Sequence, residues 1–160
     1  MKRFSSWLWS SKAPTATVLV RLMVGAVFLS EGVQKFLYAT RGSERFARIG
    51  FASPAATAGF VGVVEILGGL LLLLGLLTRP AACVLLINIS VAILSTKVPI
   101  LLGRGFWGFS GPSGAAHGFW QMAHEARTDF CMWTGSLFLI LAGPGRLSLD
   151  ALVFRRASRS

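Results

Sequence analysis

The stretch GFVGVVEILGGLLLLLGLLTR, from Gly59 to Arg79, decides the class of fold. It is long enough to cross a bilayer as a helix, since the hydrocarbon core takes about 20 apolar residues in that conformation. Near its middle, however, stands one carboxylic acid, Glu65. A charged group at this depth costs at least about 2.5–3.5 kcal/mol on insertion scales. A spanning helix here therefore predicts a partner for Glu65 inside the protein.

The composition is that of an integral membrane protein. Of the 160 residues, 54% are hydrophobic and 14% charged, against roughly 45–50% and about 25% in a soluble domain, and the mean hydropathy is +0.66. The formal net charge is +10, but the basic residues are scattered or flank apolar runs, whereas a nucleic-acid footprint needs them on one face. We expect the lipid bilayer as partner, and no nucleic acid.

Four segments are apolar enough to span the membrane as helices. Pro99 disturbs the end of the third, and Gly143-Pro144-Gly145 stops the fourth. The sequence thus predicts a single all-α domain, residues 1–160, built as an integral membrane four-helix bundle. The expected spans cover approximately residues 17–38, 55–77, 81–98 and 124–142.

The distribution of basic residues predicts the orientation. Four spans place both termini on one side, and the side richer in Lys and Arg is usually cytoplasmic. We therefore expect the bacterial cytoplasmic (inner) membrane, crossed several times, with both termini in the cytoplasm. The termini side carries Lys2, Arg3, Lys12, Arg79, Arg146, Arg155, Arg156 and Arg159, and the other side carries Arg41, Arg45, Arg48, Arg104 and Arg127, with Lys97 arguable.

The two ends of the chain carry further signals. Lys2 and Arg3 precede the first span as in a signal peptide, but that span contains charged residues, so we expect it to be retained. Near the C-terminus, SLDALVFRR offers Ser148 as a helix N-cap and Asp150 in the first turn. It predicts a short interfacial helix on the inner surface.

The segment from Leu101 to Trp120 is rich in glycine and aromatic residues. Its six glycines and one proline disfavour a helix, and its aromatic side chains are typical of a membrane interface. We place it on the outer surface. An anchoring belt is the simpler interpretation, and a lid over a hydrophobic ligand is the alternative.

The helical spacing of the first two spans offers Glu65 its partners. Both helices place glycines beside their charges on one face, which lets two antiparallel helices approach closely. We expect an intramembrane charge network in the bundle interior, in which these groups neutralise one another unless Glu65 is protonated. Its members are Arg21, Glu31, Lys35 and Glu65.

Polar residues on the other two spans extend this interior. Asn88, Ala92 and Ser95 share a face of the third span, and the fourth carries Glu125, Asp129, Met132 and Ser136. Histidines and carboxylates can bind a divalent metal, but no H-E-x-x-H or i, i+4 histidine pair occurs, and we expect none. A candidate ligand mouth is formed by Trp107, His117, Trp120, His124, Glu125 and Asp129.

The two cysteines, Cys83 and Cys131, lie in apolar runs without a C-x-x-C motif. This spacing supports neither a redox dithiol nor a zinc site. We expect both to pack as small apolar residues.

Three motifs resemble those of the DoxX family of small four-helix membrane proteins, over nearly the whole chain. RLMVGAVFLSEGVQKF resembles the first-span pattern, VEILGGLLLLLGLLTRPAA the second-span pattern, and GPGRLSLDALV the closing G-x-G-x-x-S-L-D. The glycine- and aromatic-rich segment before the fourth span departs from the family, where many members are shorter. The recurring charged positions of the family match Arg21, Lys35, Glu65, Arg79 and Asp150.

The resemblance implies a redox setting. Founding members are membrane subunits associated with quinol oxidation and thiosulfate:quinone oxidoreductase activity, and others accompany membrane oxidoreductase complexes. This implies a quinone, with no covalently bound cofactor, and other membrane redox subunits or a homo-oligomer as partners. Glu65 is then the best catalytic candidate, because a mid-membrane carboxyl group is a functional candidate by default.

Three functions remain open from the sequence. The first is an accessory or quinone-interacting subunit of a membrane oxidoreductase complex. The alternative is a non-enzymatic structural or assembly subunit that docks a larger partner complex, and whether the chain is an enzyme is left open. A transporter is the third and least favoured function, because a chain of 160 residues would have to dimerise to form one and no inverted repeat is evident.

Overall fold

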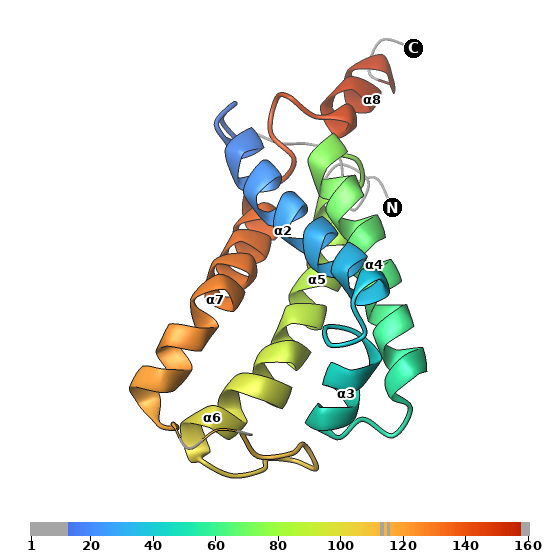
Figure 1. Cartoon of the computed structure of the whole chain (residues 1–160). Helices are drawn as coiled ribbons and strands as arrows, with labels where there is room; N and C mark the ends of the chain where they lie inside the picture. The colour runs from blue at the N-terminus through green and yellow to red at the C-terminus, as the bar shows by residue number, and fades with distance from the viewer. Residues whose placement is uncertain (1–12, 113, 115, 158–160) are drawn as a thin grey trace.

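The computed structural model describes residues 13–112, 114 and 116–157 (Figure 1). In this part of the chain the regular elements are all helices, which confirms the predicted all-α class. Four residues counted for the orientation, Lys2, Arg3, Lys12 and Arg159, lie outside it. The elements are α2 (Thr17–Leu37), α3 (Ser43–Ile49), α4 (Pro54–Leu74), α5 (Thr78–Ala92), a π-helix η1 (Ile93–Lys97), α6 (Val98–Leu102), α7 (Phe119–Ala142) and α8 (Leu149–Ala157).

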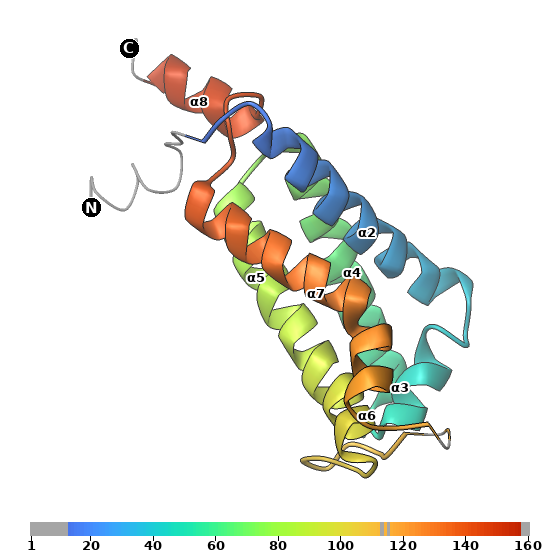
Figure 2. The same ribbon diagram turned by 90° about the vertical axis from the view of Figure 1, so that its left-hand side faces the viewer.

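The four long helical segments pack in a ring around one core. Helix α2 lies against α4, α4 against α5, α5 against α7, and α7 closes the ring on α2 (Figures 1 and 2). The core takes residues from all four segments: Val24, Phe28, Leu72, Ala81, Ala82, Leu85, Ile89, Met132 and Leu139.

Within the described residues, three helical segments are long and apolar enough to cross a membrane: Thr17–Leu37, Pro54–Leu74 and Thr78–Leu102. Many large apolar side chains on their outer surfaces are exposed, as expected of residues that face lipid. The predicted fourth span lies within α7, which is not among these three and carries charged residues in its first half. Its crossing of the membrane stays a prediction.

Glycines set the distance between α2 and α4. A Cβ added to Gly25 would lie 2.9 Å from the carbonyl oxygen of Gly69, and one added to Gly69 would lie 2.7 Å from that of Gly25. Gly32 and Gly62 approach in the same way further along the two helices. Only glycine leaves room for backbones this close, so the predicted small-residue stripes do face each other.

The third helix continues past its predicted end. It passes through Pro99 and reaches Leu102. A proline ring inside an α-helix clashes with the carbonyl four residues earlier, here that of Ser95. The turn from Ile93 to Lys97 is a π-helix, and this wider turn accommodates the proline without ending the helix.

The segment between α2 and α4 folds into a short helix that the sequence patterns did not predict. Helix α3 ends at Gly50 in the left-handed conformation, with φ 101°, and its Phe46 is buried. The ring of Phe51 lies 5.2 Å from that of Phe46 and 5.3 Å from that of Phe109. The amide of Ser110 donates to the carbonyl of Ile49 at 2.8 Å. The glycine-rich loop therefore packs on α3.

The end of the bundle near the two termini is closed by a buried carboxylate. Asp150, on the first turn of α8, accepts from the amides of Leu77 at 2.8 Å and Thr78 at 2.9 Å, the start of α5. Ser148 caps α8 as predicted, because its Oγ accepts from the amide of Ala151 at 3.1 Å. The predicted C-terminal helix is present, and its Asp150 caps the start of α5.

Two arginines complete this end. Arg21 donates to the carbonyls of Leu72 (3.0 Å), Leu73 (3.2 Å), Pro144 (2.8 Å) and Leu147 (2.7 Å). Arg79 donates to carbonyls at the C-terminal end of α7. Each guanidinium thus satisfies carbonyl groups that a helix end leaves without an intrahelical donor.

Candidate functional site

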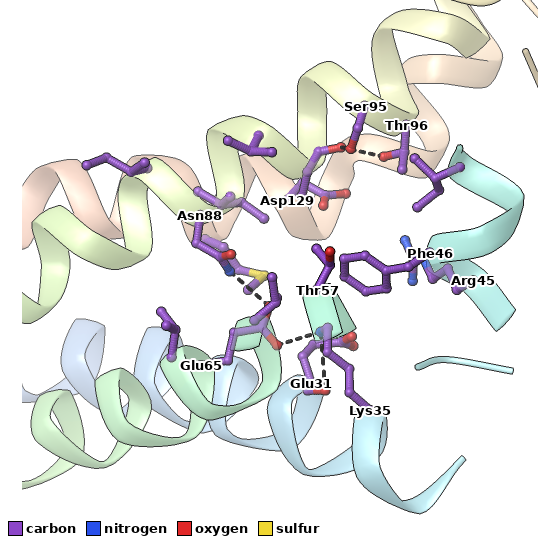
Figure 3. A pocket seen from close by; sticks show the side chains of 18 of the residues that line it. Glu31, Lys35, Arg45, Phe46, Thr57, Glu65, Asn88, Ser95, Thr96 and Asp129 are labelled. Atoms are coloured by element: carbon purple, nitrogen blue, oxygen red, sulfur yellow. Dashed lines mark hydrogen bonds and ion pairs between the residues drawn. The ribbon is translucent and has the colours of Figure 1, made fainter. Parts of the chain in front are cut away.

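Glu65 lies at the middle of α4 and is almost fully buried. Its Oε2 is 2.5 Å from Nζ of Lys35 on α2, and its Oε1 accepts from Nδ2 of Asn88 on α5 at 3.0 Å (Figure 3). Lys35 also donates to the backbone carbonyl of Glu31 at 3.3 Å. One carboxyl group therefore joins three helices, and its charge is compensated as the sequence required.

Arg21 does not belong to this group, contrary to the expected network of four charges. Side chains on a helix lean toward its N-terminus. On antiparallel helices that lean carries Lys35 and Glu65 toward each other, whereas it carries Arg21 away, toward the termini. The register adds to this effect: Gly25 opposes Gly69, which leaves Lys35 nearer than Arg21 to the level of Glu65.

The Glu65 pair lies on the wall of a cavity of about 560 Å³. This volume is in the range of small-molecule sites, about 300–1,000 Å³. Residues from α2, α3, α4, α5, η1 and α7 line it, and most of the lining is apolar. The apolar part includes Phe46, Ile49, Phe51, Phe60, Val61, Val64, Val84, Ile87, Ile89, Val91 and Met132.

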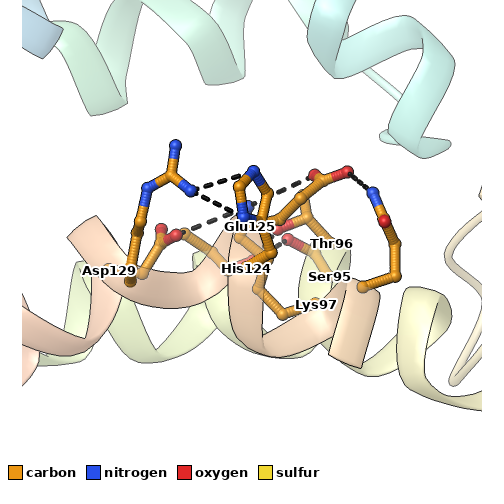
Figure 4. Close-up of polar contacts among 9 residues, drawn as sticks. Ser95, Thr96, Lys97, His124, Glu125 and Asp129 are labelled. Atoms are coloured by element: carbon orange, nitrogen blue, oxygen red, sulfur yellow. Dashed lines mark hydrogen bonds and ion pairs between the residues drawn. The ribbon is translucent and has the colours of Figure 1, made fainter. Parts of the chain in front are cut away.

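A second buried cation lies in the cavity wall, on η1. Lys97 is 3.4 Å from Oδ2 of Asp129 and 4.0 Å from Oε2 of Glu125, both on α7 (Figure 4). Asp129 lines the cavity, whereas the side chain of Glu125 is 43% exposed. The cavity thus has charged groups from every element around it except α5: Glu31 and Lys35, Arg45, Glu65, Lys97 and Asp129.

Most of the predicted ligand mouth lies outside this cavity. Of its six residues, Asp129 alone lines the cavity, and Glu125 contacts it indirectly through Lys97. His124 is exposed and contacts Arg127. Trp107, His117 and Trp120 are exposed in or next to the glycine-rich loop. The structure therefore separates the loop aromatics from the polar interior.

Sequence reasoning missed three contributors to the cavity. Arg45 and Phe46 come from α3, whose C-terminal Gly50 is a recognisable helix-stop signal. Lys97 was an arguable flanking charge, yet its side chain is 9% exposed and points into the bundle. Its place depends on the π-helical turn, which no simple periodicity reveals.

The donor set suits a polar organic group better than a metal ion. The described residues contain no cluster of three or more His, Cys, Asp or Glu that could hold a metal. What the cavity does offer near Glu65 is a carboxylate, an ammonium and an amide next to an apolar volume. Such a site can donate to and accept from one polar head group while apolar walls surround the rest.

Comparisons with known proteins agree with these features. A DoxX family model matches residues 16–98, over half of the chain. "Uncharacterized membrane protein Rv3486" of Mycobacterium tuberculosis is 48% identical over 156 residues, 96% of this chain and 91% of its own length. "Putative oxidoreductase CatD" of Bacillus subtilis is 27% identical over 139 residues, 87% of each chain. No solved structure matches significantly. The chain is a membrane protein and belongs to the DoxX family.

Proposed function

We propose that this protein is a quinone-interacting subunit of a membrane oxidoreductase system, and that the head group binds in the cavity beside Glu65. The observation that carries the proposal is the position of Glu65, near the middle of a helix that can span the membrane and on the wall of a largely apolar cavity. A buried ionisable group in a spanning helix is costly and most often serves function. The name of the Bacillus relative gives independent support for a redox setting.

The residues around Glu65 fit a quinone or quinol head group. A quinone supplies two carbonyl oxygens and, when reduced, two hydroxyl groups. Lys35 and Asn88 can donate to a carbonyl oxygen, and the Glu65 carboxylate can accept from a hydroxyl group. These roles require Lys35 or Asn88 to exchange a hydrogen bond with Glu65 for one with the ligand, so that each donor remains bonded. Glu65 is then placed to accept or return a proton.

The test compares Glu65→Gln with the parent protein. Gln keeps the size and one acceptor of Glu65 but cannot take up a proton. We expect Glu65→Gln to assemble normally and to lose most quinone-linked activity in its host membrane. Glu44→Gln is the matched control, because Glu44 is an exposed residue of α3 outside the cavity lining. Normal quinone reduction by a well-assembled Glu65→Gln variant would remove the redox role.

A second candidate is a non-enzymatic structural or assembly subunit. It is favoured by the saturation of Glu65, both of whose oxygens already have donors from neighbouring helices. Under this proposal the carboxyl group fixes the register of α2, α4 and α5, and partner subunits dock on the outside. The same experiment separates the two candidates, since a purely structural Glu65 predicts parental activity for any variant that assembles.

A further inference from the structure

The helices α4 and α5 touch near the turn that joins them and then separate. A Cβ on Gly68 would lie 2.8 Å from Cγ of Leu85, so the two helices are in close contact at that level. From there toward α3 they diverge, as Figure 1 shows. The cavity is lined by α4 from Thr57 to Glu65 and by α5 from Val84 to Ala92. The cavity therefore lies between α4 and α5 where the two helices diverge.

Six of the lining residues are exposed: Arg45 on α3, Thr128 on α7, and four apolar residues on α4 and α5. Phe60 on α4 is 71% exposed, and on α5 Val84 is 50%, Ile87 66% and Val91 44% exposed. The three residues of α5 follow one another at intervals of three and four, so they share one face of the helix. Both helices belong to segments that can span the membrane. The exposed rim of the cavity on α4 and α5 is thus apolar, and it belongs to two segments that can span the membrane.

The two ends of the cavity differ from its α4–α5 side in the side chains that lie there. On the loop side, Phe46 and Phe51 form a ring cluster with Phe109, and the lining there includes the exposed Arg45 of α3. The ion pair of Lys97 with Asp129 also lies in the cavity wall. Toward the termini, the buried core residues Leu72 and Leu85 follow. A solute from the loop side meets packed rings and charged side chains, whereas between α4 and α5 the exposed lining residues are all apolar.

We infer that the cavity opens sideways into the bilayer between α4 and α5, and that its ligand is a membrane-dissolved amphiphile with a long hydrocarbon tail. The head group lies at Glu65, Lys35 and Asn88, and the tail leaves past Phe60 and Ile87 into the lipid. The opening needs no loop movement, because the rim residues Phe60, Val84, Ile87 and Val91 are already exposed. This inference rests on the proposed function for the nature of the head group and adds the requirement for a tail.

The test narrows the opening and compares two probes that differ only in the tail. Ile87→Trp adds bulk at the rim, and Leu19→Trp is the matched control, since Leu19 on α2 is 65% exposed and does not line the cavity. Binding to the protein in lipid nanodiscs is measured for decylubiquinone and for the same dimethoxy-methyl-benzoquinone without its tail. We expect Ile87→Trp to weaken decylubiquinone binding by about tenfold and to leave tail-free binding unchanged.

The control should bind both probes like the parent protein. Equal weakening of both probes by Ile87→Trp, or an effect on neither, would overturn the sideways opening. A parent protein that binds neither probe would remove the proposed function as well, so the two failures can be told apart. Independently, a decylubiquinone analogue with a photoreactive tail end should label the rim of α4 or α5. Labelling confined to residues 103–112 would contradict the inference.

Discussion

Lys35 of α2 and Glu65 of α4 form an ion pair in the interior of the bundle, with Nζ and Oε2 2.5 Å apart. Asn88 of α5 occupies the other carboxylate oxygen. Both charged side chains are about nine-tenths buried, so bulk water can compensate little of either charge. The consequence of removing one of them is therefore larger than the consequence of removing both.

We expect Glu65→Leu to destabilise the protein by about 3–5 kcal/mol, because it leaves the Lys35 ammonium buried and unpaired. The double variant with Lys35→Leu should recover part of this loss. The measurement is a double-mutant cycle on unfolding in mixed micelles. The cycle of Glu65→Leu with Arg21→Leu should be additive, since Arg21 bonds to carbonyls at the other end. Coupling with Arg21, and none with Lys35, would contradict the observed pairing.

Arg21→Lys should destabilise the end of the bundle near the termini, although the charge is kept. Arg21 reaches four carbonyl oxygens on α4 and the 143–147 loop, and a single ammonium has neither the fork geometry nor enough donors to do so. We expect a loss of about 1.5–3 kcal/mol for each hydrogen bond that is not replaced. The exposed Arg146 gives the control, as Arg146→Lys should unfold like the parent. Equal stability of both variants would speak against the carbonyl contacts.

Asp150→Asn should loosen the start of α5. The amide can accept from one of the two backbone amides of Leu77 and Thr78, and the other then lacks a partner. Such an unsatisfied buried donor costs about 1–3 kcal/mol. Hydrogen exchange should accelerate at these two amides. The isosteric change at an exposed acid, Glu44→Gln, should leave their exchange rates unaltered, and parental protection in the Asn variant would refute the cap.

Two glycines of the same helix should respond oppositely to alanine. In Gly69→Ala the new methyl group meets the Gly25 carbonyl and the Leu29 backbone, so α2 and α4 must separate, at a cost of about 1–3 kcal/mol. In Gly59→Ala the methyl group has no neighbour within 4 Å, and the better helix propensity should add about 0.5–1 kcal/mol. Unfolding of both variants in mixed micelles checks this contrast. Loss of stability in Gly59→Ala alone would be inconsistent with the packing described.

The orientation in the membrane is tested with a reporter enzyme that is active only outside the cytoplasm. Fused after Arg159 it should be inactive, and inserted after Gly111 it should be active, because the basic flanks predict cytoplasmic termini and an external loop. The insertion lies in the glycine-rich loop, outside the described helices. Activity at the C-terminus together with inactivity in the loop would reverse the orientation.

Helical periodicity was sufficient to predict the three helical segments that can span a membrane, although the third extends beyond its predicted end, and the burial of Glu65. The glycines and charges of α2 and α4 recur at helical spacing, so their facing stripes and the need for a cationic partner could be predicted. The choice between Arg21 and Lys35 as the partner of Glu65 stayed open, because both lie at a similar distance from Glu65 along the helix axis. The direction in which side chains lean resolves it, and that direction is a general property of α-helices.

The cavity itself could not be predicted. Its width depends on the angle between α4 and α5, and its loop side depends on contacts among Phe46, Phe51 and Phe109, which are far apart in the sequence. The hydrogen bonds of Arg79 and Asp150 could not be predicted for the same reason. Each acts on backbone groups of a distant segment, and no pattern of neighbouring residues reports such a contact.

The cap that Asp150 places on α5 also orders events during synthesis. The ribosome completes the α4–α5 hairpin long before it reaches residue 150, so the amides of Leu77 and Thr78 lack their carboxylate acceptor while α7 is being made. They are satisfied only when α8 folds back against this turn. A nascent chain interrupted before Asp150 therefore leaves these two backbone donors without their carboxylate acceptor, so the bundle end is completed only by the last helix of the chain.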